Sequence, residues 1–333
     1  MRKREQENSG NPWVRLVFVL ICVLSAAGSQ GQVLIDHTST DLNLVPGAWI
    51  AQAAADLHIA YNHTSHGSQI ITGMRALELF PPYGGPSGGT YEWSPDGSEG
   101  LHLDDNGIPC GVADLSAGDY IDGNGVTPWV TCTRDFLDLP ANDHINVIMW
   151  SWCSINGHDG QRYVDNMEIL VSEYPDVDFV FMTGHAQGQG EDMTPGGVHY
   201  NNELIRQHCQ SNGRILFDFA DIEAYDPDEV YFWDLNLWDD LDYNGGGNWG
   251  REWIIANPGS ELHQLTTGDG VPGYDGCGNC AHSDSPWEAR INCVLKGRAA
   301  WWMYARLAGW GQPEFIFSDG FESGDLGGWS SSG

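Results

Sequence analysis

The chain has 333 residues, of which 46 are acidic and only 14 are basic, and its formal net charge is −32. A surface of this charge repels nucleic acids and anionic membranes, which excludes both as partners. Beyond a short leader, the chain has the length of one large domain, or of one domain with a small appendage, and it can bury a sizeable core.

Residues 1–32 are typical of a secretion signal. Basic residues at positions 2 to 4 precede the apolar run Leu16–Leu24, and the small residues Ser25–Gly28 follow it. The apolar run is too short to span a bilayer comfortably, and no later segment is apolar enough. We therefore expect a secreted protein, extracellular or periplasmic, that has no membrane association once the signal is removed.

Seven cysteines remain beyond the signal: Cys110, Cys132, Cys153, Cys209, Cys277, Cys280 and Cys293. Most of them should pair in an oxidising compartment. Local spacing favours one bridge between the first two, and another between Cys293 and either Cys280 or Cys277. The odd count leaves one thiol, and Cys153 is the candidate for a buried free one because it follows an apolar strand.

Alternating strands and helices predict the fold class. Four apolar runs are predicted as strands: Leu57–Asn62, Ile145–Trp150, Val177–Thr183 and Arg214–Phe219. The spacing of apolar residues predicts four helices: Ser68–Leu79, Gln161–Tyr174, Val198–Cys209 and Pro286–Leu307. This order indicates βαβ units, and therefore an α/β fold with a parallel sheet. Ligands of such folds bind beyond the carboxyl ends of the strands, so the polar segments 63–68, 151–158 and 183–187 should meet there.

Two long insertions interrupt the alternation, at about residues 81–140 and 224–280. Loops of this length in a compact domain are usually functional or disordered. The second contains four tryptophans, Trp233, Trp238, Trp249 and Trp253, which argue against disorder. They form either a small satellite core or a platform that stacks on sugar rings. Residues 313–333 resemble a short C-terminal motif of exported bacterial proteins and carry no recognisable catalytic group.

The predicted strand 57–62 runs directly into the polar turn His63-Thr64-Ser65-His66-Gly67-Ser68 and then into a predicted helix. A serine at such a turn is well placed to be a nucleophile, because its Oγ stands at the sheet edge and the free N–H groups of the helix face a developing oxyanion. The alternative is that Ser65 or Ser68 only caps the helix.

The order of these elements resembles the SGNH (GDSL-like) hydrolases. His63-Thr64-Ser65-His66-Gly67 matches the first block of the family, most closely in a divergent His-x-Ser branch. Ala281-His282-Ser283, just before the last predicted helix, matches the block that holds the catalytic histidine. The resemblance covers most of Val33–Gly311. It implies a flavodoxin-like, three-layer α/β/α hydrolase domain over residues 33–312.

The resemblance also implies the catalytic groups. Ser65 would attack an ester carbonyl, and His282 would take its proton. The acid of the family stands three residues before the histidine, where this chain has Asn279, and Asp275 or Asp284 are the alternatives.

The remaining site residues are implied in the same way. Asn156 is the nearest candidate for the oxyanion asparagine of the family, although Asn156-Gly157 is also typical of a turn. The resemblance suggests that His63, His66 and His185 line the substrate pocket.

We therefore expect a secreted serine esterase that needs no cofactor for catalysis and hydrolyses O-acyl esters, acetyl esters above all. Export and the tryptophan-rich insertion favour an acylated polysaccharide as the substrate, although a small-molecule ester is also open. One alternative is a secreted carbohydrate-binding or calcium-stabilised surface protein on a decayed hydrolase fold, without catalysis.

The second alternative is a metal-dependent hydrolase that uses clustered histidines. Its candidate ligands are His63, His66, His185, His199 and His282, with Asp221 or Glu223 as oxygen ligands. No HExxH motif supports this alternative.

A structural calcium site has local sequence support. Asp240, Asp242, Asn244 and Gly245 match the first six positions of an EF-type loop. The twelfth position is Arg251, so the usual bidentate glutamate is missing.

Overall fold

Seven parallel strands form the central sheet of the computed structural model, which describes residues 32–118 and 121–311. They are β1 Leu34–Ile35, β2 His58–Asn62, β3 Trp93–Ser94, β4 Leu101–Asp105, β5 Val147–Trp150, β6 Asp178–Met182 and β7 Ile215–Phe217. Their order across the sheet is β1-β7-β6-β5-β2-β4-β3. Because all strands run in one direction, their carboxyl ends meet at a single edge, which is where α/β folds place their ligands.

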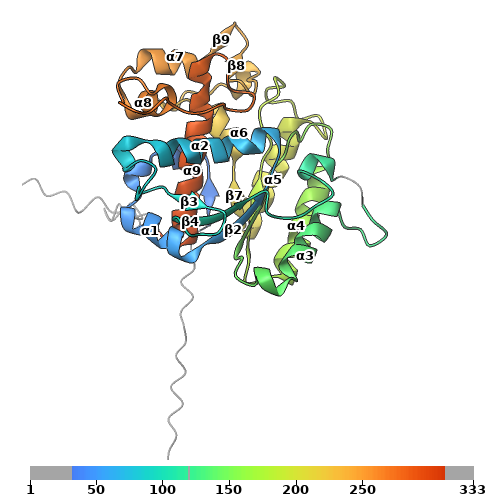
Figure 1. Ribbon diagram of the computed structural model, residues 1–333. Coiled ribbons are helices and arrows are strands. Elements are labelled where there is room, and N and C mark those ends of the chain that lie inside the picture. The colour runs from blue at the N-terminus through green and yellow to red at the C-terminus, as the bar shows by residue number, and fades with distance from the viewer. Residues whose placement is uncertain (1–31, 119–120, 312–333) are drawn as a thin grey trace, which may run out of the picture. The chain divides into compact units, whose positions relative to one another are not determined.

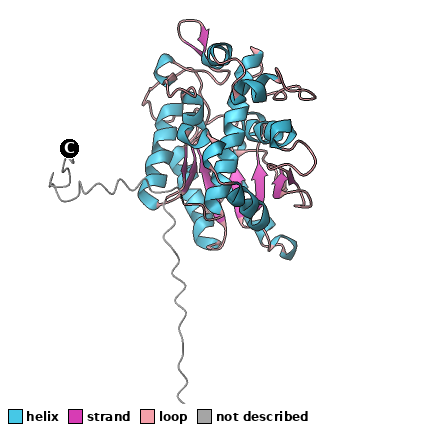
Figure 2. Cartoon of the chain, turned by 90° about the vertical axis from the view of Figure 1, so that its left-hand side faces the viewer, coloured by secondary structure: helices cyan, strands magenta, loops and turns pink. Residues whose placement is uncertain are grey.

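Helices flank this sheet (Figures 1 and 2). In one group α9 (Ile291–Leu307) contacts both α1 (Gly47–Asp56) and α2 (Ser68–Leu79). In the other, α4 (Gly160–Glu173) contacts both α3 (Pro128–Leu137) and α5 (Val198–Asn212). Figure 1 shows the two groups on opposite sides of the strands. The short helices α6 (Phe219–Ala224), α7 (Trp249–Ala256) and α8 (Glu261–Thr267) lie in the C-terminal half of the chain.

The contact between α2 and α9 is unusually close. A Cβ atom at Gly73 of α2 would lie 1.8 Å from the carbonyl oxygen of Cys293, and one at Gly297 of α9 would lie 2.2 Å from the carbonyl carbon of Gly73. Only glycine permits this approach of the two backbones. The helix that follows Ser65 is therefore held directly against the helix that follows His282.

The predicted α/β fold with a parallel sheet is confirmed. The four predicted strands are present as β2, β5, β6 and β7, and the four predicted helices as α2, α4, α5 and α9. The last helix begins at Ile291 rather than at Pro286, because Trp287–Arg290 first forms a 3-10 turn.

The prediction that residues 81–140 form only a long loop is wrong. This segment supplies α3 and two strands of the sheet, since β4 pairs with β2 and β3 pairs with β4. Neither strand was predicted, because strands were expected only where several apolar residues follow one another. β3 has two residues, and β4 ends in two carboxylates, Asp104 and Asp105.

Residues 224–280 are also more ordered than a loop. They contain α7, α8 and a small antiparallel hairpin of β8 (Asp242–Tyr243) and β9 (Gly247–Asn248). Trp233 and Trp249 are buried and belong to the core, whereas Trp238 is 51% exposed. The insertion therefore adds two rings to the main hydrophobic core, rather than forming a separate satellite core, and leaves one aromatic ring exposed.

Two disulfides join Cys110 to Cys132, as predicted, and Cys280 to Cys293, the first of the two partners that spacing left open for Cys293. The expectation of one leftover thiol is wrong, because three cysteines are free within the described residues: Cys153, Cys209 and Cys277. Cys153 is half-buried rather than buried. Cys209 lies on α5 and Cys277 in the loop before the second disulfide, and both are buried.

The predicted signal, except for its last residue Gln32, lies outside the described residues, and so does the whole predicted tail, 313–333. Within residues 32–118 and 121–311, no helix has the length and apolar character that crossing a membrane requires.

Candidate active site

Ser65 stands just past the carboxyl end of β2, in the 3-10 turn Ser65–Gly67 that leads into α2. Its Oγ is hydrogen-bonded to Nε2 of His282. The backbone of Ser65 has φ +38°, in a region that residues with a side chain rarely occupy. Ser65 does not cap α2, and the Ser68 hydroxyl donates to the carbonyl of Ser65 at 2.6 Å.

The turn is shaped by its glycine. A Cβ atom at Gly67 would lie 2.0 Å from Oγ of Ser151, at the end of β5, and 2.5 Å from Cβ of His63. The hydroxyl of Tyr61, inside β2, donates to the Gly67 carbonyl at 2.9 Å. Strand, turn and neighbouring strand are therefore packed too closely for any other residue at position 67.

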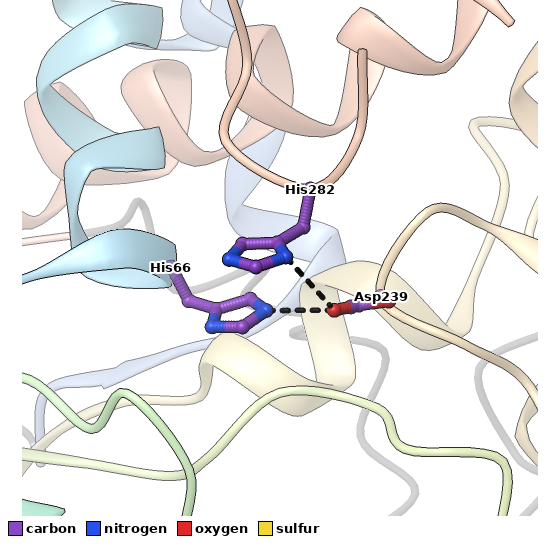
Figure 3. A group of neighbouring side chains, drawn as sticks. All are labelled: His66, Asp239 and His282. Carbon is purple, nitrogen blue, oxygen red and sulfur yellow. Dashed lines mark hydrogen bonds and ion pairs between the residues drawn. The ribbon is translucent and has the colours of Figure 1, made fainter. Parts of the chain in front are cut away.

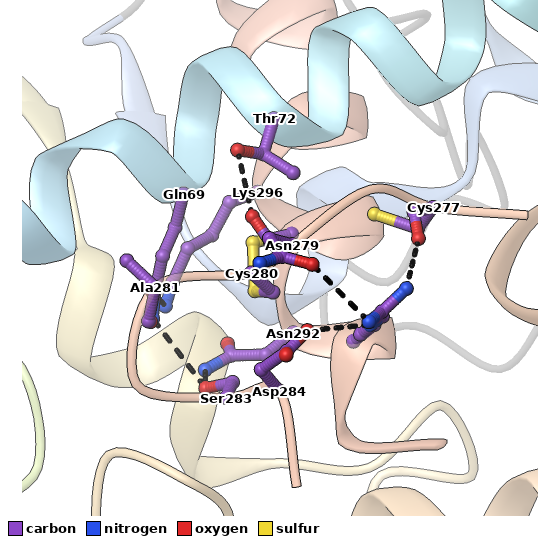
Figure 4. Close-up of a disulfide and its surroundings, with 12 residues drawn as sticks. Gln69, Thr72, Cys277, Asn279, Cys280, Ala281, Ser283, Asp284, Asn292 and Lys296 are labelled. Atoms are coloured by element: carbon purple, nitrogen blue, oxygen red, sulfur yellow. Dashed lines mark hydrogen bonds and ion pairs between the residues drawn. A yellow bond between two sulfur atoms is a disulfide. The ribbon is translucent and has the colours of Figure 1, made fainter. Parts of the chain in front are cut away.

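His282 reaches Ser65 from a loop before α9, and the two residues that precede His282 anchor this loop. The Cys280–Cys293 disulfide ties it to the first turn of α9 (Figure 4). Before the histidine, the Gln69 amide donates to the carbonyl of Ala281 at 2.5 Å. His282 itself has φ +65°, so both partners of the Ser65–His282 hydrogen bond have strained backbones.

Asp239 lies at the other nitrogen of His282. Its Oδ2 is 3.7 Å from Nδ1 of His282, an ion-pair distance, and 2.8 Å from Nε2 of His66, a hydrogen-bond distance (Figure 3). Burial would raise the pKa of Asp239, but the hydrogen bond from His66 and the nearby imidazoles lower it below its usual value. Asp239 is therefore a carboxylate placed to stabilise an imidazolium at His282.

Sequence reasoning missed Asp239. Asp239 belongs to an acidic run in the tryptophan-rich segment, and no fixed spacing links it to His282. The one feature of the sequence that could have indicated a site there is the adjacent Trp238.

The residues predicted to act as the acid beside His282 lie elsewhere. The Asn279 carbonyl accepts a hydrogen bond from Thr72, and its side-chain Oδ1 accepts one from Arg290, each at 3.4 Å (Figure 4). Asp284 pairs with the same guanidinium, 2.6 Å from Nε of Arg290. In the described part of the chain no interaction joins Asp275 to the His282 imidazole. In this geometry Asp239, rather than the predicted Asn279 or Asp275, lies at ion-pair distance from the His282 imidazole.

Three imidazole rings are stacked in the site. His66 lies between His185, at 3.4 Å between ring centres, and His282, at 3.9 Å, and the ring planes differ by only 8° and 9°. Burial and the adjacent His66 ring lower the pKa of His282, and the same two causes lower the pKa of His185 to about 4. His282 is consequently neutral near pH 7, the form in which it can accept a proton.

The tautomer of His185 follows from its partners. Its Nδ1 donates to the carbonyl of Ala186 at 2.8 Å, and its Nε2 accepts from the amide of Gln187 at 3.1 Å. A neutral ring with the proton on Nδ1 satisfies both contacts.

The predicted cluster of five histidines does not assemble in full, because two of its members have other partners. His66, His185 and His282 meet, but His63 pairs with Asp105 at 2.7 Å and His199 lies near Trp233. The two predicted oxygen ligands have other partners: Asp221 contacts His37, and Glu223 contacts Lys296.

The donor atoms of His66, Asp239 and His282 lie within 4.8 Å of one another, so this group is the one best able to hold a metal ion near Ser65. A histidine nitrogen directs its lone pair in the plane of its ring. Because the two rings are almost parallel, their lone pairs point side by side rather than at one position. An ion here would require one ring to rotate.

An open pocket of about 480 Å³ adjoins two of the three stacked histidines, His66 and His185. It is lined by His66, Cys153, Ser154, Asn156, His185, Gln187, Gln189, Trp238 and Asp239. The predicted residues Asn156, His66 and His185 line this pocket, whereas His63 does not. The exposed ring of Trp238 packs over Gly188, where a Cβ atom would lie 2.2 Å from the indole.

The predicted calcium ligands lie at the β8–β9 hairpin, and hydrogen bonds within the loop already engage two of them. Asp240 Oδ1 accepts the N–H of Asp242 at 3.0 Å, and Asp242 Oδ1 accepts the amide of Asn248 at 2.9 Å. Asn244 lies in the turn between the two strands. A calcium ion at these residues stays a prediction.

In comparisons with known proteins, no family model matches the chain, and neither does any curated protein or any solved structure. The chemistry of the site is therefore inferred from its own geometry, and the resemblance to the SGNH hydrolases stays a prediction.

Proposed function

We propose that this protein is a secreted serine esterase of the SGNH type, which hydrolyses O-acyl esters through an acyl-enzyme on Ser65. The hydrogen bond between Ser65 Oγ and His282 Nε2, at the carboxyl edge of a parallel sheet, carries the proposal. The carboxylate of Asp239 on the far side of the imidazole supports it. Under this proposal the sheet and its helices form a flavodoxin-like, three-layer domain.

The reaction has two steps. Ser65 Oγ attacks the ester carbonyl carbon while His282 Nε2 accepts its proton, and Asp239 stabilises the imidazolium that forms. N–H groups of the turn that begins at Ser65, together with the side chain of Asn156, hold the oxyanion. His282 then protonates the leaving alcohol, and a water molecule activated by the same imidazole releases the acid.

The pocket favours a neutral, hydroxyl-rich alcohol such as a sugar. Three of its lining residues, Asn156, Gln187 and Gln189, carry amides that donate and accept hydrogen bonds. The exposed indole of Trp238 offers an apolar face on which a sugar ring stacks. An acetylated carbohydrate therefore suits this pocket, whereas an anionic polymer is repelled by a chain of net charge −32.

Metal-dependent hydrolysis is a second candidate, favoured by the closeness of His66, Asp239 and His282. It differs from the serine mechanism in two ways that experiment separates. A chelator would abolish activity, and replacement of Ser65 would have little effect.

The test is hydrolysis of 4-nitrophenyl acetate, and then of acetylated xylo-oligosaccharides, by the mature chain. We expect Ser65→Ala and His282→Ala each to lower kcat at least about a thousandfold. The matched control is His199→Ala, a histidine outside the stack, which should stay within about threefold of the wild type. Wild-type activity that persists in both site variants would contradict the proposal.

A further inference from the structure

A buried ion pair adjoins the candidate active site but takes no part in the proposed chemistry. The side chains of Lys296, on α9, and Glu223, on α6, are both wholly buried. Nζ of Lys296 lies 2.5 Å from Oε1 of Glu223, donates to Oε1 of Gln69, and sits 3.7 Å from the centre of the Phe219 ring.

A contribution to the stability of the fold is a poor explanation for a buried ion pair. Taking two charges out of water is costly, and well-packed apolar residues in place of a buried pair are often neutral or stabilising. Lys296 is also the only lysine of the chain after Lys3. The other hydrogen bonds of the pair point to a role in geometry.

One branch of these hydrogen bonds links the helix that follows the Ser65 turn to the loop that holds His282. Gln69 lies in the first turn of α2, and its Oε1 accepts from Lys296 while its Nε2 donates to the Ala281 carbonyl at 2.5 Å (Figure 4). A single buried amide, oriented by the ammonium group, therefore fixes the residue before His282 against the helix that follows Ser65.

A second branch reaches the His185 loop. Oε2 of Glu223 accepts the backbone N–H of Ala186 at 2.8 Å, directly after His185. Oε1 of the same carboxylate lies 3.3 Å from the side-chain amide of Asn292.

A third branch reaches the backbone of Asp239. The Asn292 amide lies 3.3 Å from the Asp239 carbonyl and donates to Oγ of Ser283 at 2.8 Å. The Ser283 hydroxyl in turn donates to the Asp239 carbonyl. The residue after His282 and the backbone of Asp239 are thus tied together through an amide in contact with Glu223.

We infer that the Lys296–Glu223 pair is a positioning element that sets Ser65, His282 and Asp239 at the distances the proposed esterase reaction requires. This inference rests on the proposed function. The pair touches neither the substrate nor the reacting atoms. It acts through three groups that contact it directly, the side-chain amides of Gln69 and Asn292 and the backbone N–H of Ala186. Its loss should lower kcat while leaving substrate binding in the open pocket almost unchanged.

The test compares kcat and KM for 4-nitrophenyl acetate in four forms of the mature chain. Lys296→Met/Glu223→Gln removes both charges, so that neither is left buried and unpaired. Gln69→Met keeps the ion pair and cuts only its link to the His282 loop. Arg214→Met is the control, because it removes an ion pair to Glu168 of the same length, 2.5 Å, before the amino end of β7.

We expect the double variant to lose about a hundredfold in kcat and Gln69→Met about tenfold, with KM within about threefold of the wild type in both. Arg214→Met should keep kcat within about twofold. Near-wild-type kcat in Gln69→Met, or in a folded double variant with a lowered Tm, would show a purely structural role and overturn the inference. If the double variant does not fold, Gln69→Met decides. An inactive wild type would instead contradict the proposed function itself.

Discussion

At the scale of single residues, the site is marked by backbone strain. Ser65 and His282 both have positive φ values, +38° and +65°, although neither is glycine. Each such conformation costs on the order of 1–3 kcal/mol and persists only where the surroundings enforce it. Here the enforcement comes from the close packing around Gly67 on one side and the anchored loop on the other.

This strain predicts an unusual order of stability. Ser65→Gly should be more stable than Ser65→Ala by about 0.5–1 kcal/mol, because glycine accepts positive φ without a steric cost. At Ser68, where φ is −64°, the order should reverse and Ser68→Gly should be the less stable of its pair. Urea unfolding of the four variants measures both differences. Equal stability of the two Ser65 variants would mean that position 65 is not strained.

The stacked imidazoles predict the pH dependence of catalysis. Burial and His66 lower the pKa of His282, so this proposed base stays neutral at a pH where an ordinary imidazole is protonated. The acid limb of kcat/KM should therefore lie below pH 6.5, the usual histidine value. Asp239→Asn removes the charge that raises this pKa, so it should shift the limb to still lower pH and reduce kcat. A wild-type limb at or above pH 6.5 would contradict this prediction.

At the scale of elements, the crossing of α2 and α9 brings the two halves of the site together. Ser65 precedes one of these helices and His282 the other, and the helices touch through Gly73 and Gly297. The positions of Ser65 and His282, the proposed nucleophile and base, therefore depend on helix packing as well as on local loops.

Gly73→Ala tests this dependence. The added Cβ would meet a backbone carbonyl at 1.8 Å, which no side-chain rotation can relieve. We expect a loss of about 2–3 kcal/mol in the free energy of unfolding, together with a lower kcat. Gly47→Ala is the control, since a Cβ there meets nothing within 4 Å, and it should be neutral or slightly stabilising. Full stability of Gly73→Ala would show that the helices can separate at little cost.

The elements that sequence reasoning predicted share a physical property. The strands β2, β5, β6 and β7 are apolar runs buried in a parallel sheet, and the helices α2, α4, α5 and α9 have regular apolar spacing. The missed strands β1, β3 and β4 are either two residues long or end in charged residues. Their pairing comes from tertiary contacts, which local periodicity does not record.

At the scale of the whole molecule, the site could be predicted in part. Ser65 and His282 stand next to predicted elements, so topology was enough to bring them to one edge. Asp239 could not be found this way, because it reaches the site from an irregular segment far from both in sequence. Spacing predicted that Cys293 pairs with either Cys280 or Cys277. The choice of Cys280, and the role of this bridge in holding the His282 loop, follow only from the structure.

The buried histidine His185 links the site to the acid stability of the molecule. Its pKa in the fold is about 4, mainly through burial, against about 6.5 for an unfolded chain. The unfolded state therefore binds the proton first, and the stability owed to a neutral His185 falls as the pH drops from about 6.5 to 4. The loss should be about 3 kcal/mol.

Urea unfolding at pH 7 and pH 4 measures this effect. Carboxylates also titrate in this range, but they contribute similarly to the wild type and to His185→Gln, so the difference between the two proteins isolates His185. We expect the variant to lose less stability on acidification than the wild type. Equal losses would show that His185 is protonated in the fold without cost.

Covalent labelling of the mature chain with a fluorophosphonate, followed by mass spectrometry of its peptides, tests most directly whether Ser65 is the nucleophile. We expect a single adduct on Ser65, loss of ester hydrolysis in proportion to labelling, and no adduct in the Ser65→Ala or His282→Ala variants. An adduct on another residue, or hydrolysis that continues undiminished once Ser65 is fully labelled, would contradict this role of Ser65.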